Sequence, residues 1–114
     1  MAAPEISKET EQQIAEFQNA QSALQLTMVQ RQQVQLQMDE IDNALEELKK
    51  STGAVYRAVG TVLVESKKDE TVKELTERKD TLAVRLNVLT KQEEKLRSKL
   101  TELRAKIEGS AGAG

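Results

Sequence analysis

Apolar residues recur three or four positions apart along two long stretches, and this spacing constrains the fold more than any other feature. In the first stretch, one helical stripe would contain Phe17, Ala20, Leu24, Thr27, Arg31, Val34, Met38, Ile41, Leu45 and Leu48. In the second stretch, the stripe would contain Val72, Leu75, Lys79, Leu82, Leu86, Leu89, Glu93, Leu96, Leu100, Leu103 and Ile107. This repeat is typical of a coiled-coil seam. The similar lengths of the stretches predict two helices that pair antiparallel within the chain.

The expected helices cover residues 7–50 and 69–108. Ser7 is suited to cap the first helix and Asp69 the second, because their side-chain oxygens accept hydrogen bonds from free backbone amides. Gly109 is expected to end the second helix, with residues 109–114 as a flexible tail. The polar seam residues Lys79 and Glu93 are expected to fix the register of the pair rather than to bind a ligand.

Near the start of the first helix, a second stripe fits the apolar pattern better than the strict repeat. This stripe contains Ile14, Phe17, Gln21, Leu24 and Met28. A seam that departs from the repeat in this way predicts looser packing toward the N-terminal end.

The stretch between the helices predicts a β-hairpin over residues 54–66. It is rich in valine and has Gly60-Thr61 at its centre, so the expected strands cover residues 54–59 and 62–66. Gly-Thr is a weaker hairpin signal than Asn-Gly, and the register and the facing of the side chains stay open. A helical conformation of this stretch is less favoured because of its glycines and valines.

Composition excludes several classes of function. The 114 residues include two aromatic residues, 32% charged residues, no histidine and no cysteine, and the net charge is −2. Without histidine, cysteine or a glycine-rich phosphate loop, we expect no enzyme activity, cofactor or metal site. The mixed charges predict no nucleic-acid binding, and the lack of a long apolar run predicts no membrane segment.

The predicted hairpin requires a partner. A two-stranded hairpin is marginally stable in water and has two unpaired edges, and this chain has no other segment to cover its valines. Pairing of hairpins from several chains would bury these edges in a closed barrel. The sequence therefore predicts a mainly α protein, a long antiparallel coiled coil whose single β-hairpin assembles into an intersubunit β-barrel.

The order of long helix, hairpin and long helix resembles the beta-class subunits of prefoldin over essentially the whole chain. The segments that carry the resemblance are NALEELKK (43–50), VYRAVGTVLVES (55–66), KDETVKEL (68–75) and KQEEKLRSKL (91–100). Alpha-class subunits have two central hairpins, whereas this chain has room for one. The resemblance is to the archaeal type of beta subunit, and it implies a single prefoldin-type domain over residues 1–114.

The resemblance implies a cytoplasmic, ATP-independent holding chaperone, a hexamer of two alpha-class and four beta-class subunits. Such a hexamer binds unfolded polypeptides at the coiled-coil tips and delivers them to a group II chaperonin. The implied client-binding residues at the tip are Ile14, Phe17, Leu100, Leu103 and Ile107. The implied assembly residues in the hairpin are Val55, Tyr56, Val59, Val62, Leu63 and Val64.

Two alternatives stay open from the sequence. The tip residues could simply close the coiled coil, without contact to a client. The whole chain could also be a structural coiled-coil scaffold, or a prefoldin-like protein that assembles from one subunit type into filaments.

Overall fold

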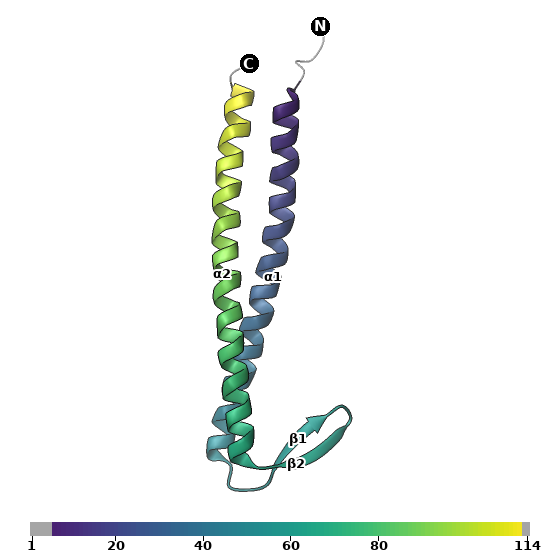
Figure 1. Cartoon of the computed structure of the whole chain (residues 1–114), viewed down its shortest axis with the longest axis vertical. Coiled ribbons are helices and arrows are strands. Elements are labelled where there is room, and N and C mark those ends of the chain that lie inside the picture. Colours follow the sequence, from purple (N-terminus) through teal and green to yellow (C-terminus); the bar gives the residue numbers. More distant parts are fainter. Residues whose placement is uncertain (1–5, 113–114) are drawn as a thin grey trace. The chain divides into compact units, whose positions relative to one another are not determined.

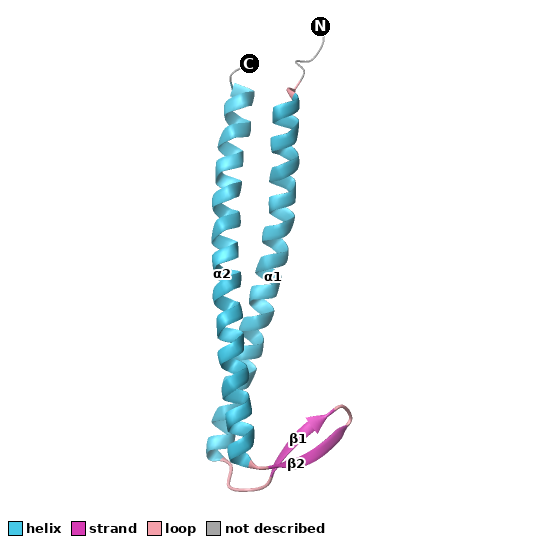
Figure 2. Ribbon diagram, in the orientation of Figure 1, coloured by secondary structure: helices cyan, strands magenta, loops and turns pink. Residues whose placement is uncertain are grey.

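The computed structural model describes residues 6–112, which form two helices and one β-hairpin (Figures 1 and 2). Helix α1 spans Lys8–Lys50, strands β1 and β2 span Val55–Val59 and Val62–Ser66, and helix α2 spans Lys68–Gly112. The predicted fold class is confirmed as two long helices joined by one antiparallel hairpin. The intersubunit barrel stays a prediction.

The chain divides into two compact units. Unit 1 combines the part of α1 up to Arg31 with the part of α2 from Val88 onward. Unit 2 is the continuous stretch of residues 32–87, which contains the adjoining parts of both helices and the hairpin. Within each unit the two helical segments run antiparallel, side by side (Figure 1).

The buried residues follow the predicted seam. In unit 1, the buried apolar side chains are those of Ala20, Leu89 and Leu103, and in unit 2 they are those of Val34 and Ile41. Every other member of the two predicted stripes is buried or half-buried. The 3-4 repeat therefore identified the packed face of both helices.

The predicted drift of the seam near the start of α1 is wrong. Ala20 and Thr27 remain 4% and 2% exposed, whereas Gln21, which the alternative stripe requires, is exposed. Side chains at the strict repeat face the partner helix whatever their polarity, and small ones let the two backbones approach. Ile14 and Met28 are half-buried beside the seam, on its flank.

Two ion pairs join the helices at polar seam positions. In unit 1, Arg31 Nε donates to Glu93 Oε2 over 2.5 Å, and Arg97 Nη2 donates to the other oxygen of Glu93 over 3.0 Å. In unit 2, Lys79 Nζ lies 2.5 Å from Asp42 Oδ1. A shift of either helix by one turn would separate these charges, so the pairs favour a single alignment.

Glu93 should make the stability of unit 1 sensitive to acid. The hydrogen bond from Arg97, followed by the hydrogen bond and charge of Arg31, holds the pKa of Glu93 below its ordinary value of 4.5, although burial opposes this shift. Because the folded-state pKa is the lower one, the stabilisation is complete above pH 4.5 and is lost as pH falls through the folded-state pKa. Thermal melting between pH 7 and pH 3 should show this loss.

The matched comparison uses Glu93→Gln and Glu94→Gln. The first substitution should reduce the dependence of the melting temperature on acid, and the second, at the neighbouring exposed position, should leave it unchanged. An identical acid dependence in wild type and Glu93→Gln would contradict the assignment.

The helix ends confirm one predicted cap and correct two boundaries. Ser7 Oγ accepts a hydrogen bond of 3.1 Å from the Thr10 amide, as expected of a capping residue. Asp69 lies in the first turn of α2 rather than before it, where its charge still favours the helix dipole. Gly109 does not end α2, which continues to Gly112, because one glycine costs a helix only about 1 kcal/mol and no proline follows. Residues 113–114 of the predicted tail lie outside the described residues.

The hairpin has the register that its two-residue turn requires. Val59 pairs with Val62, Arg57 with Val64, and the ladder extends to the base of the hairpin. Gly60 has φ of +60°, and no non-glycine residue has positive φ among the described residues. Positive φ at the first central position alone is the pattern of a type II′ turn, which favours glycine there and matches the twist of the strands.

Candidate assembly and client-binding surfaces

The register settles which hairpin side chains share a face. One face carries Val55, Val59, Val62 and Val64 together with Arg57. The opposite face carries Tyr56, Ala58, Leu63 and Glu65. Both faces are thus largely apolar. The face that carries the four valines, which we call the valine face, has the more continuous apolar surface.

Most of the predicted assembly residues are open to solvent. The exposed fractions of Tyr56, Val59, Val62, Leu63 and Val64 lie between 48% and 69%. Val55, at the base of β1, is half-buried. The sheet within residues 6–112 contains only β1 and β2, so the outer edge of each strand is unpaired. Exposed apolar side chains beside free strand edges are typical of a surface that pairs with another chain.

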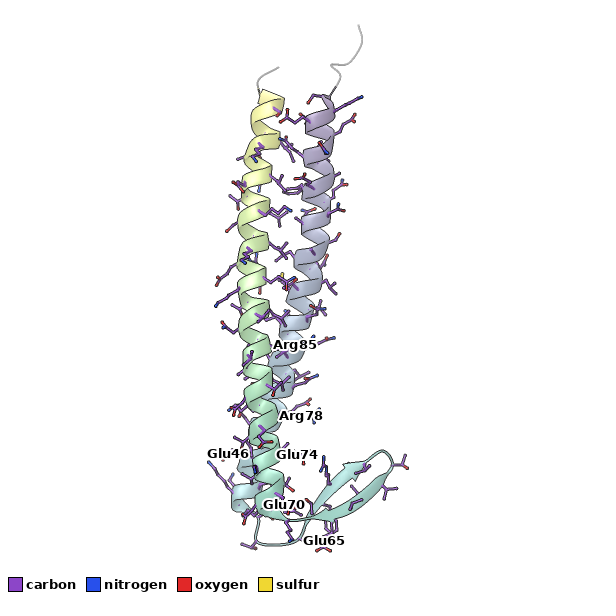
Figure 3. The ribbon with its side chains drawn as sticks, in the orientation of Figure 1. Glu46, Glu65, Glu70, Glu74, Arg78 and Arg85 are labelled. Atoms are coloured by element: carbon purple, nitrogen blue, oxygen red, sulfur yellow. The ribbon has the colours of Figure 1, made fainter. Side chains whose placement is uncertain are left out.

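Polar contacts hold the base of the hairpin to the helices of unit 2. Arg57 forms an ion pair with Glu74 of α2, and Figure 3 shows Glu74 on the part of α2 beside the hairpin. The Lys68 ammonium donates to the Ser51 carbonyl oxygen over 2.9 Å, and the hydroxyls of Ser66 and Thr71 lie 2.8 Å apart. These contacts give the hairpin a defined exit direction from the helices.

A groove of about 540 Å³ lies where the hairpin meets the helices of unit 2. Its apolar lining includes Ala44, Leu48, Val55 and Leu75. Ala44, Leu48 and Leu75 were not among the predicted assembly residues, because their contribution depends on how the hairpin leaves the helices. The groove extends the exposed hairpin surface onto the ends of α1 and α2.

The predicted client-binding residues divide into two groups in unit 1. Ile14, Phe17 and Ile107 are half-buried and line a groove of about 310 Å³ between the helices. Leu103 is only 5% exposed and packs in the seam, and Leu100 is half-buried without lining the groove. The groove also includes Gln18 and Gln21 of α1 and Arg104 and Glu108 of α2, of which only Gln21 was a member of a predicted stripe. We call it the tip groove.

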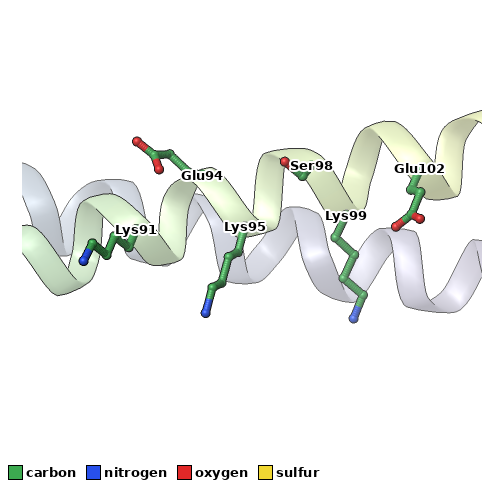
Figure 4. A pocket seen from close by; sticks show the side chains of 6 residues that line it. All are labelled: Lys91, Glu94, Lys95, Ser98, Lys99 and Glu102. Carbon is green, nitrogen blue, oxygen red and sulfur yellow. The ribbon is translucent and has the colours of Figure 1, made fainter.

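The outer face of α2 in unit 1 has a different character. Figure 4 shows Lys91, Lys95 and Lys99 projecting to one side of the helix, with Glu94 and Ser98 on the other. Such alternating charges are typical of a solvated helix face. Within residues 6–112, no group of three or more acidic, histidine or cysteine side chains is placed to hold a metal ion. Neither helix in that range contains an apolar stretch of the kind that crosses a bilayer.

The fold defines a class of protein in which one exposed β-hairpin joins two long antiparallel helices. The chain belongs to the prefoldin family, because its residues 11–113 match the family described as prefoldin subunit. Membership of this family supports a chaperone role.

Individual relatives place the chain beside the beta subunits of this family. It is 40% identical over 106 residues to prefoldin subunit beta of Archaeoglobus fulgidus, with 91% of each chain covered. It is 43% identical over 107 residues to prefoldin subunit beta of Thermococcus gammatolerans, with 92% of each covered. The crystal structure of the prefoldin beta subunit from Thermococcus strain KS-1 matches with a TM-score of 0.84 and 39% identity, covering 95% of this chain and 96% of that one.

Proposed function

We propose that this chain is the beta-class subunit of a holding chaperone that works without ATP. It assembles through its hairpin with an alpha-class prefoldin subunit and with further copies of itself, in a hexamer of two alpha and four beta chains. The observation that carries this proposal is the exposure of the hairpin's valines, Tyr56 and Leu63 beside two unpaired strand edges. The beta subunits among its relatives support the same assignment.

The proposed client is a non-native polypeptide, bound at the tip groove and passed on to a group II chaperonin in the cytoplasm. Ile14, Phe17 and Ile107 offer the apolar floor for such a segment. Leu103 and Leu100 support this site from the seam, where they hold the two helices together. The proposal needs no enzyme chemistry, since binding of exposed apolar segments is sufficient to prevent their aggregation. It also treats units 1 and 2 as parts of one prefoldin-type domain.

The test is suppression of aggregation when a chemically denatured client protein is diluted into buffer without nucleotide. The wild-type chain, assembled with an alpha-class partner, should suppress light scattering at low molar ratio. The double substitution Ile14→Ser and Ile107→Ser should raise the amount needed by about thirtyfold, because each of the two lost apolar contacts weakens binding by about 1 kcal/mol.

The matched control replaces two exposed apolar residues of unit 1 outside the groove, with Leu26→Ser and Val88→Ser. It should behave like wild type. Equal suppression by both double variants would reject the tip groove as the client site. A well-formed assembly that suppresses no aggregation would reject the holding function and leave a structural scaffold. Assembly without an alpha-class partner into long polymers would favour the filament-forming alternative.

A further inference from the structure

The solvent-facing side of α1 in unit 1 is free of charge from residue 17 to residue 30, although charged residues lie before it. Charged residues make up 32% of the chain, yet Arg31 is the only one between Phe17 and Met38. The guanidinium of Arg31 is engaged by Glu93 at the seam. Glutamines, leucines and other uncharged residues therefore form the exposed side of α1 from residue 17 to residue 30.

The beginning of this uncharged stretch forms one rim of the tip groove. Gln18 and Gln21 line the groove and are exposed, and within residues 6–112 their side-chain amides make no hydrogen bond. On the opposite rim, Arg104 Nε donates to Glu108 Oε1 over 3.0 Å, so these two charges offset each other. The groove thus has an apolar floor and a rim with no net charge.

A glutamine amide suits one kind of ligand group in particular. It offers two donors and an acceptor, which complement the carbonyl oxygen and the amide of a polypeptide main chain. A charged rim would favour clients of opposite charge, whereas a neutral amide pairs with the main chain of any sequence. Folded proteins use most of their main-chain groups internally, so an extended non-native segment is the partner with such groups free.

We propose that Gln18 and Gln21 bind main-chain amides and carbonyls of an extended client segment whose apolar side chains lie on Ile14, Phe17 and Ile107. This inference rests on the proposed holding function and adds its mode of recognition. The glutamines would recognise the main chain of the client through hydrogen bonds, and the apolar floor would recognise its hydrophobic side chains. The charge of the client should consequently have little effect on its affinity for the groove.

The test compares two peptides on the assembled protein by fluorescence anisotropy. The first is a dye-labelled, terminally blocked 12-residue peptide of leucine, alanine and serine. The second has the same sequence with N-methyl groups on its central amides, which removes main-chain donors. Wild type should bind the methylated peptide about tenfold more weakly, as expected for the loss of one or two hydrogen bonds.

The decisive variant is Gln18→Met with Gln21→Met, which keeps the side-chain length and removes the amides. It should bind the unmethylated peptide about tenfold more weakly than wild type and should no longer distinguish the two peptides. A purely hydrophobic groove predicts the opposite, because methionine makes the rim more apolar. The control, Gln12→Met with Gln33→Met, changes two exposed glutamines outside the groove and should retain wild-type behaviour.

The outcomes separate this inference from the proposed function. Binding of both peptides with equal affinity by wild type, or tighter binding by the Gln18→Met and Gln21→Met variant, would overturn the role of the glutamines and leave the holding function standing. No binding of either peptide by wild type would count against the holding function itself. A change in the size of the assembly on Gln18→Met and Gln21→Met, seen by sedimentation, would show that another copy of the chain occupies the groove and would likewise overturn the inference.

Discussion

Replacing Val62 with glutamate is expected to abolish assembly while leaving the helices folded. Val62 is exposed in the single chain and pairs with Val59 beside the turn, on the valine face of the hairpin. If that face is covered by other chains, a carboxylate placed there would be buried without a partner. The cost of such burial is several kcal/mol, which corresponds to a loss of more than about a hundredfold in the association constant.

Light scattering coupled to size-exclusion chromatography would measure this effect in mixtures with an alpha-class subunit. The control is Thr61→Glu, which adds the same charge to the same hairpin at its solvent-facing turn. Circular dichroism should show equal helix content in both variants. A Val62→Glu chain that still enters an assembly of wild-type mass would refute the role of this valine.

The second large effect is expected for Leu89→Ala in the seam of unit 1. Leu89 is 6% exposed, so its removal leaves a cavity between the helices as well as lost apolar contact. Substitutions of this kind cost about 2–5 kcal/mol, and a two-helix seam that closes partly around the gap should fall at the lower end of that range. The melting temperature should fall by roughly 4–8 °C for each kcal/mol.

The neighbouring residue supplies the comparison, since Val88 is 57% exposed on the same helix. Val88→Ala should change the stability by less than about 0.5 kcal/mol. Urea denaturation monitored by helix content would give both values. Similar destabilisation by the two substitutions would mean that the seam assigned to α2 is out of register.

The sequence was sufficient for the parts of the fold that depend on local periodicity. The seam from Val72 to Ile107 was predicted residue by residue, because only one face of a helix can meet its partner. The end of α2 was not predicted correctly, because a helix continues past a single glycine such as Gly109 when no following residue disrupts the helical backbone. The predicted drift near Gln21 was wrong because position in the repeat, rather than the hydrophobicity of single residues, determines which face of α1 is packed.

The tip groove was predicted only in part. Ile14, Phe17 and Ile107 were found as apolar residues near the chain ends, but Leu100 and Leu103 belong to the seam, and the distinction depends on which flank of α1 faces α2. The rim residue Gln18 carries no signal in an apolar pattern, and Gln21 appeared only as a polar member of the alternative stripe. The run of residues without charge after Phe17 was the feature that could have indicated them.

The ion pairs at the seam also bear on which alignments the helices of neighbouring chains can adopt. In the proposed assembly, several such chains share one β body, and helices with identical repeats could pair between chains. One alignment of the helices is stabilised by two ion pairs, between Arg31 and Glu93 and between Lys79 and Asp42. A helix that entered a neighbour's seam out of alignment would leave Glu93, which is only 9% exposed, without a cationic partner, a penalty that favours the aligned pair. In the proposed assembly, the same contacts would thereby hold each pair of helices in a single alignment.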